Sequence, residues 1–187
     1  ERTTSYADYM FSIYYRYMLM MKYFKNDNYF MTKYLPRIEK FIEYFVHTNT
    51  PIGLNAAFND ARRGLSLVRV FKEMGEFFKR GDFIGAIKNN LSPETLAALK
   101  VEPKEPKVKS IDYPISKFVV MRDSWTPESY FMMTNYGQFQ NHAHYDHLDF
   151  EIYANGMPIA IDAGLGKYGY VDPIHVTWYK NPLAHNM

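Results

Sequence analysis

The stretch Asn141–Phe150, NHAHYDHLDF, holds the residues of this sequence that are best suited to chemistry. It places His142, His144, Asp146 and His147 within six residues, and five of the chain's six histidines lie between His142 and the last residue. Imidazole and carboxylate groups bind metal ions and transfer protons near neutral pH. Such a density of both groups indicates a metal site or a catalytic site.

The spacing of these residues suggests how they could act together. In a β-strand alternate residues share one face, so a strand here would point His142, His144 and Asp146 the same way. Three ionisable groups on one face do not suit an ordinary hydrophobic core. The alternatives are a metal or catalytic site and a hydrogen-bonded ladder on the surface.

The elements around this stretch fall into two blocks. Residues 1–100 have the apolar periodicity of helices; Pro36 should kink or split one of them, and Ser92 should cap another. The segment NTPIGLNAAFNDARRG reads as a loop. VEPKEPKVKS is the clearest linker, and we place the linker at residues 101–112.

The pattern changes to strands after the linker. ISKFVVMRD, ESYFMMTNY, HLDFEIYA and MPIAIDA alternate apolar and polar residues, and Asn155-Gly156 is a strong hairpin signal. A run of helices followed by a run of strands predicts an α+β fold, with an antiparallel sheet domain at residues 113–187.

The composition limits the possible functions. The chain has 187 residues, a net charge of +2 and no cysteine, which excludes disulfides and thiolate metal sites. No apolar run is long enough for a membrane span. Residues 1–110 carry 18 basic against 12 acidic residues, and the other 77 carry 4 against 8. A basic first half suits an anionic partner, whereas strong nucleic-acid binding is not expected.

Two known families contain a motif like that of His142–His147. One is the H-x-H-x-D-H metal cradle of metallo-β-lactamases, which needs an Asp-Gly turn before the histidines and glycine-rich residues after them. Here Asp162-Ala163-Gly164 comes after the motif, and Leu148-Asp149-Phe150 stands where the glycines would be. A metallo-hydrolase therefore remains only an alternative.

The segment Phe118–Asn186 resembles the β-domain of the heparinase II/III family of polysaccharide lyases. The matching elements, in order, are FVVMRDSW, NHAHYDHLDFEIYANG, PIAIDAG followed by Tyr168, and AHN near the end. In the first half, Tyr14-Tyr15-Arg16-Tyr17 resembles the Tyr-x-Arg helix of the family's (α/α) toroid, and PIGLNAAFND resembles its Pro-x-x-Gly-Asp loop loosely. The resemblance implies a fragment with the end of the toroid at 1–100 and the start of a β-sandwich domain.

The resemblance also implies an activity. Such lyases cleave uronic-acid-containing anionic polysaccharides, of the alginate or glycosaminoglycan type, by β-elimination. Tyr14 would be the general acid and a candidate for the base, and His142 would be the base or the group that neutralises the uronate carboxylate. Tyr168 and Tyr170 are weaker candidates, and Arg16 is expected to pair with a carboxylate. A non-catalytic acidic-glycan-binding relative is the other alternative.

The resemblance further implies a structural zinc ion held by His144, Asp162 and His185, with water as fourth ligand. His147 and His175 have no assigned role and are expected at the surface. A regular two-residue turn at Asn155-Gly156 would pair Asp162 with Asp149, on the face opposite His144. Joint ligation therefore requires a longer turn, a bulge, or a break in the strand before His147.

Other implications concern the whole protein. The sequence begins without Met and ends in what reads as a strand region, so we expect it to be incomplete. The family resemblance implies a periplasmic or secreted protein whose partner is an acidic polysaccharide or oligosaccharide.

Overall fold

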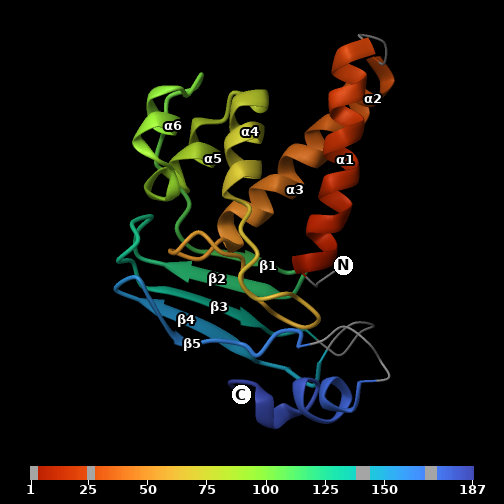
Figure 1. The fold of residues 1–187 in the computed structure, drawn as a ribbon, viewed down its shortest axis with the longest axis vertical. Helices are drawn as coiled ribbons and strands as arrows, with labels where there is room; N and C mark the ends of the chain where they lie inside the picture. The colour runs from red at the N-terminus through yellow and green to blue at the C-terminus, as the bar shows by residue number, and fades with distance from the viewer. Residues whose placement is uncertain (1–3, 25–27, 138–143, 167–171) are drawn as a thin grey trace.

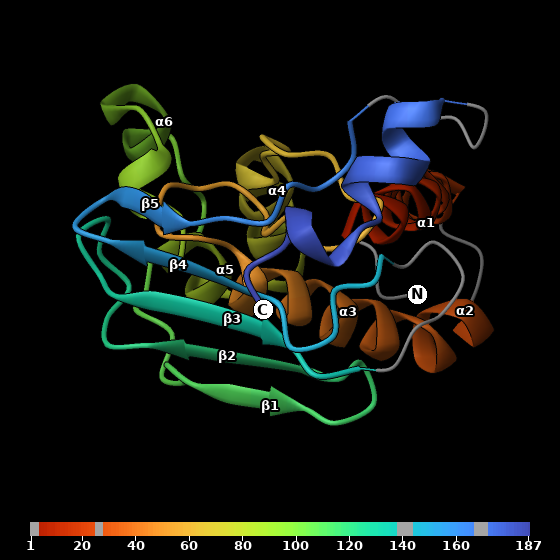
Figure 2. The same ribbon diagram turned by 90° about the horizontal axis from the view of Figure 1, so that it is seen from below.

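A computed structural model describes residues 4–24, 28–137, 144–166 and 172–187. Helices form the first part of the chain and an antiparallel sheet forms the second, with the helices on one side of the sheet (Figures 1 and 2). The predicted α+β fold is confirmed. None of the helices in the described ranges is long and apolar enough to span a membrane.

The helical part follows its sequence signals. Pro36 lies in the first turn of α3 and separates it from α2, and the Ser92 hydroxyl accepts the Thr95 N–H at 3.2 Å to cap α6. Buried side chains of α1, α3 and α4 form one core, which includes Met18, Ile42 and Phe71. The helices are α1 (Thr4–Phe24), α2 (Asn28–Lys33), α3 (Leu35–Thr48), α4 (Val68–Phe78), α5 (Gly81–Gly85) and α6 (Pro93–Ala97).

The five strands form one sheet in sequence order, and every neighbouring pair is antiparallel. They are β1 (Ile111–Tyr113), β2 (Phe118–Arg122), β3 (Phe131–Asn135), β4 (Phe150–Ala154) and β5 (Met157–Ala160). The first strand begins inside the expected 101–112 linker. Phe118, Phe131 and Met133 on one face pack with Ala56 and Phe58 of the α3–α4 loop into a second core.

The loop at residues 49–67, between α3 and α4, joins the helices to the sheet. The Ala57 N–H donates to Glu151 Oε1 of β4 at 2.9 Å, and the Leu165 N–H donates to the Ala61 carbonyl at 2.8 Å. Residues 56–61 are almost fully buried. Residues 56–61 of this loop are therefore part of the interior, whereas residues 62–64 are exposed.

Arg122, in the stretch FVVMRDSW that ends at Trp125, makes a second connection between the helices and the sheet. Its Nη2 donates to the carbonyls of His47 and Asn49, at 2.6 and 2.8 Å, where α3 ends. The guanidinium carbon lies 3.7 Å from the centroid of the Trp125 ring. Arg122 thus satisfies the terminal carbonyls of α3 and stacks on an aromatic ring.

The stretch that carries the histidine motif differs from the prediction. Residues 144–149 form a turn and not a strand, and β4 begins only at Phe150. Leu148 has a positive φ of 69°, and the Asp149 N–H donates to the Asp146 carbonyl at 3.0 Å. Alternation along a strand therefore does not decide where His144 and Asp146 point. His142 lies outside the described residues.

The hairpin contains the irregularity that joint ligation required. Asn155 and Gly156 form the expected two-residue turn, with φ values of 51° and 73°. The register then shifts between Ile152 and Tyr153, so that Ile152 pairs with Ala160. Because of this bulge, and because β4 begins only at Phe150, Asp149 and Asp162 are not regular cross-strand partners.

Candidate metal centre

Four segments that lie far apart in the sequence bring seven ionisable side chains together in the interior. The α3–α4 loop contributes Asp60, the turn before β4 contributes His144, Asp146 and Asp149, and Asp162 follows β5. The last segment contributes His175, at the start of the helical turn η2 (His175–Tyr179), and His185, which follows η3 (Pro182–Ala184). The side chain of His185 is fully buried, and each of the other six residues is at most 3% exposed as a whole.

Asp60 lies between two of the histidines. Its Oδ1 is 2.9 Å from His144 Nε2 and 3.5 Å from His175 Nε2. The His144 backbone N–H also donates to Asn59 Oδ1 at 3.3 Å. Because a carboxylate accepts the proton of His144 Nε2, Nδ1 is left as the nitrogen with a free lone pair, and it makes no hydrogen bond within the described part of the chain.

His185 is held in a comparable way. Its Nε2 donates to the Tyr179 carbonyl at 3.0 Å, which turns Nδ1 toward two carboxylates. The Nδ1 atom lies 3.1 Å from Asp162 Oδ2 and 3.4 Å from Asp149 Oδ2. The Gly164 N–H donates to the other oxygen of Asp162, which fixes that carboxylate.

The electrostatics of the cluster favour a cation. Burial alone would lower the pKa of His185, but hydrogen bonds to Asp149 and Asp162 outweigh it and raise the pKa to about 10. Burial raises the pKa of Asp162 well above its usual range and that of Asp146 to about 6. Burial acts in the same direction at Asp149, but its hydrogen bond to His185 and the other hydrogen bonds of this carboxylate together outweigh burial, so the pKa of Asp149 is lowered instead. Positive charge next to these buried carboxylates therefore stabilises their ionised forms.

The residues present fit a zinc ion. Ligand atoms of His144, Asp162 and His185 all lie within 4.8 Å of one another, as do those of Asp146, Asp149, Asp162 and His185. Both histidines offer Nδ1 and use Nε2 for an outer hydrogen bond, which is the usual arrangement of zinc-binding imidazoles. Two imidazoles with carboxylate oxygens are a common donor set for Zn²⁺.

The structure thus brings together His144, Asp162 and His185, the three residues predicted as metal ligands. The catalytic candidate Tyr14 lies on α1 with its side chain 38% exposed. The other catalytic candidates, His142, Tyr168 and Tyr170, lie outside the described residues.

Three expectations need correction or comment. The prediction that His175 is a surface residue is wrong, because it is 1% exposed and faces Asp60. The same prediction for His147 is confirmed, because this residue is exposed. Its Nε2 lies 3.3 Å from the Tyr136 carbonyl oxygen, and it belongs to neither of the two groups of possible metal ligands described above. Among the described residues, no carboxylate forms an ion pair with the exposed Arg16.

Sequence reasoning missed Asp60 and Asp149. In the sequence Asp60 belongs only to a loosely matching loop, and the expected hairpin places Asp149 on the face opposite His144. The concentration of five histidines in the last 46 residues was a usable signal for His175. No local pattern marks Asp60, because 84 residues separate it from His144.

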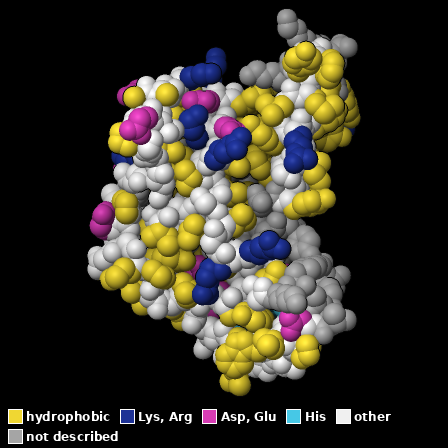
Figure 3. All heavy atoms as spheres, viewed as in Figure 1, with side chains coloured by type: hydrophobic (Ala, Val, Ile, Leu, Met, Phe, Trp, Pro, Cys, Tyr) yellow, Lys and Arg dark blue, Asp and Glu magenta, His cyan; other side chains and the backbone are white. Residues whose placement is uncertain are grey.

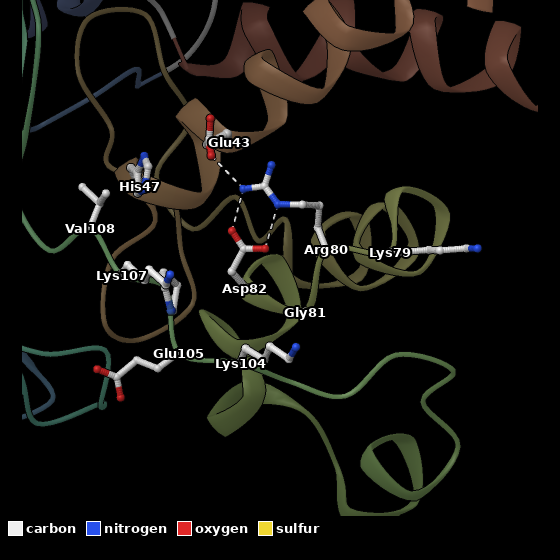
Figure 4. Close-up of a pocket in the computed structure, with 11 residues that line it drawn as sticks. Glu43, His47, Lys79, Arg80, Gly81, Asp82, Lys104, Glu105, Lys107 and Val108 are labelled. Atoms are coloured by element: carbon white, nitrogen blue, oxygen red, sulfur yellow. Dashed lines mark hydrogen bonds and ion pairs between the residues drawn. The ribbon is translucent and has the colours of Figure 1, made fainter.

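A separate cavity of about 510 Å³ lies among α3, the α4–α5 junction and residues 104–108 (Figure 4). Arg80 projects into this region and pairs with Glu43 and Asp82, at 2.7 and 2.5 Å, so its charge is compensated. Lys104 and Lys107 also line the cavity. None of its lining residues belongs to the metal cluster.

Comparison with known proteins agrees with this architecture. Residues 105–186 match the family model described as heparinase II/III-like, C-terminal. Over these residues the sequence is thus similar to the C-terminal domain of heparinase II/III-like proteins. Comparison with curated proteins found no match.

Solved structures share the fold over the whole chain. A heparinase III described as the BT4657 gene product aligns with 100% of this chain and 28% of its own, at 22% identity and a TM-score of 0.82. A mutant of heparan sulfate lyase HepC from Pedobacter heparinus aligns over 99% and 28%, at 19% identity and a TM-score of 0.83. The chain thus spans little more than a quarter of the length of these proteins.

Proposed function

We propose that this chain is part of a polysaccharide lyase that cleaves uronic-acid-containing polysaccharides, of the alginate or glycosaminoglycan type, by β-elimination. The observation that carries the proposal is the family match over residues 105–186. Fold similarity to a heparinase III and a heparan sulfate lyase supports it across the remaining residues. A periplasmic or secreted location would suit such a substrate.

The reaction sets three chemical requirements. The enzyme must neutralise the uronate carboxylate, remove the C5 proton beside it, and protonate the leaving oxygen at C4. We assign Tyr14 as the general acid and candidate base, and His142 as the base or neutralising group. The exposed position of Tyr14 on α1 is compatible with contact to a polymer.

We assign a structural role to the zinc ion. His144, Asp162 and His185 would hold it, and the bound ion would connect the turn before β4, the segment after β5 and the last segment of the chain. When bound it supplies positive charge to buried carboxylates and is not needed to generate a hydroxide, because β-elimination consumes no water. Elemental analysis should find about one zinc per chain, and His144→Ala should remove it and lower the melting temperature.

The direct test follows the unsaturated uronate that β-elimination creates. The full-length protein is incubated with heparan sulfate, heparin, hyaluronan, chondroitin sulfate and alginate while ultraviolet absorbance is recorded. Tyr14→Phe and His142→Ala should each reduce turnover by at least ~100-fold, the usual scale for loss of a proton-transfer group. Tyr9→Phe, on the same helix and 63% exposed, is the matched control and should retain activity.

Two outcomes would count against the proposal. Binding to these glycans without any absorbance change would indicate a non-catalytic glycan-binding relative. Normal turnover by Tyr14→Phe would show that the phenol takes no part in the chemistry.

A further inference from the structure

His175 is a buried histidine that is not one of the proposed zinc ligands. It is 1% exposed and begins the helical turn η2. Its Nε2 lies 3.5 Å from Asp60 Oδ1, and the same oxygen lies 2.9 Å from His144 Nε2. A carboxylate oxygen has two lone pairs and can face two such groups at once. Asp60 therefore lies between a proposed ligand and a histidine from the last segment of the chain.

The carboxylate of Asp60 depends on its surroundings for its direction. The terminal torsion of an aspartate is broad, so the rotamer alone does not fix where the two oxygens point. His175 fills space next to this carboxylate, in a region where both residues are 1% exposed. Its ring also packs edge to face against the His144 ring, with the centroids 5.9 Å apart. Loss of the His175 ring would leave room for Asp60 to turn away from His144, or for water to enter.

The helical turn η2 supports the surroundings of two proposed ligands. The Tyr179 carbonyl accepts from His185 Nε2 at 3.0 Å, and the Lys180 carbonyl accepts the Tyr145 N–H, next to His144, at 3.1 Å. One short segment thus contacts both the turn before β4 and the end of the chain. This explains how the side chain of its first residue can be held at a fixed place beside Asp60.

A role as a ligand is the competing interpretation of His175. Ligand atoms of Asp60, His144 and His175 also lie within 4.8 Å of one another. In the proposed zinc site, however, the ion lies with Asp162 and His185, and His144 Nε2 remains with Asp60. His175 is then outside the set of ligands and can act only through Asp60.

We propose that His175 is a positioning residue of the zinc site: it holds the Asp60 carboxylate against His144 Nε2, and through Asp60 it fixes the direction of the His144 ring. This inference rests on the zinc site of the proposed function. Outer partners that orient a ligating histidine contribute to metal affinity. His175 extends this support by one residue, from the α3–α4 loop to the last segment of the chain.

The first test measures metal binding by the full-length protein. Competition with a chromophoric chelator gives the Zn²⁺ affinity, and the visible spectrum of bound Co²⁺ reports the geometry of its ligands. His175→Ala should weaken Zn²⁺ binding by about 10-fold, the lower end of the range for an outer partner, and should alter the Co²⁺ spectrum. His175→Gln, whose amide can reach Asp60, should restore most of the affinity. His147→Ala, at an exposed histidine, is the matched control and should bind like the wild type.

A double-mutant cycle with Asp60→Asn separates positioning from a general loss of structure. If His175 acts through Asp60, His175→Ala should reduce Zn²⁺ affinity much less in the Asp60→Asn background than in the wild type, because the effects of coupled residues do not add. A merely structural role would reduce the affinity by the same factor in both backgrounds. His175→Asn, whose shorter amide does not reach Asp60, replaces His175→Ala in the cycle if that variant does not fold.

Three results would overturn the proposal. Unchanged Zn²⁺ affinity in His175→Ala, or equal factors in the two backgrounds, would remove the positioning role and leave the zinc site standing. Complete loss of binding in His175→Ala, as expected for His144→Ala, would make His175 a ligand. Absence of Zn²⁺ and Co²⁺ binding by the wild type would overturn the zinc site itself, whereas the polysaccharide lyase activity is measured separately through the unsaturated uronate.

Discussion

At His144 one ring nitrogen is hydrogen-bonded and the other, within the described ranges, is not, and this difference defines the candidate metal centre at the residue scale. Asp60 accepts from Nε2, which leaves Nδ1 for an ion. The carboxylate that orients the ligand comes from the helical part of the chain, whereas the ligand comes from the turn before β4. The affinity of the site for a metal ion should therefore depend on Asp60, although Asp60 does not bind the ion itself.

Asp60→Asn tests this dependence. An amide is a weaker acceptor than a carboxylate, so we expect Zn²⁺ affinity to fall by roughly 10–100-fold with little change in the melting temperature of the metal-free protein. The measurement is competition with a chromophoric chelator. Asp123→Asn, an exposed carboxylate that accepts the Tyr130 N–H, is the control. Equal affinities for both variants would show that Asp60 does not orient His144.

His47, remote from the metal cluster, should make stability depend on pH. Burial lowers its pKa below the usual 6.5, although nearby Glu43 opposes this, and its Nδ1 lies 2.6 Å from the Tyr113 hydroxyl. Since the unfolded chain takes up the proton more readily, the neutral imidazole favours folding above about pH 6.5, and stability is lost as the pH falls below it. The other charged groups that influence it are Arg122, Asp82 and Arg80.

Thermal melting between pH 5 and 8 measures this effect. His47→Gln should flatten the loss of stability on the acid side relative to the wild type, and His147→Gln, at an exposed site, should not. Identical acid profiles for the wild type and His47→Gln would mean that His47 does not contribute to the pH dependence.

At the scale of elements, the α3–α4 loop does most to connect the two parts of the fold. It packs Ala56 and Phe58 against the sheet, and it carries Asp60 to the metal cluster. The segment Asp162-Ala163-Gly164 packs against this loop. Gly164 has a φ of 60°, and a Cβ there would lie 2.7 Å from the Ala61 carbonyl oxygen.

Gly164→Ala should therefore destabilise the protein by roughly 2–3 kcal/mol, from backbone strain and from displacement of the loop. Gly64→Ala isolates the strain, because Gly64 also has a positive φ of 82° but a Cβ there would meet nothing within 4 Å. It should cost only about 1 kcal/mol. Denaturant unfolding compares the two, and equal losses would show that the close approach at Gly164 is unimportant.

Some of these elements could be predicted from the sequence, and others could not. Pro36, Ser92 and Asn155-Gly156 act through local chemistry, so the helix break, the cap and the hairpin could be predicted. The turn at residues 144–149 could not, because alternating polar residues also suit a strand. Its shape depends on contacts such as the Leu148 N–H to the Asn135 carbonyl at 2.8 Å, and on the β4–β5 bulge. The three proposed metal ligands came from family resemblance, and Asp60 and Asp149 required the fold.

On the scale of the whole molecule, α1 presents an extensive apolar surface. Figure 3 shows hydrophobic side chains gathered over α1 and α2. Tyr23 is 81% exposed and Phe24 63% exposed. Apolar surface of this extent is typical of a helix that packs against another element. The chain also spans only 28% of the heparinase III that it resembles, so functional experiments belong on the full-length protein.

The central proposal is that the full-length protein to which this chain belongs would break an acidic polysaccharide by elimination and not by hydrolysis. Mass spectrometry of the oligosaccharides released by the full-length protein distinguishes the two directly. Our account predicts fragments that carry an unsaturated uronate at the new non-reducing end and are lighter than hydrolysis products by one water. Fragments that carry the mass of that added water, or no cleavage of any uronate-containing polymer, would contradict it.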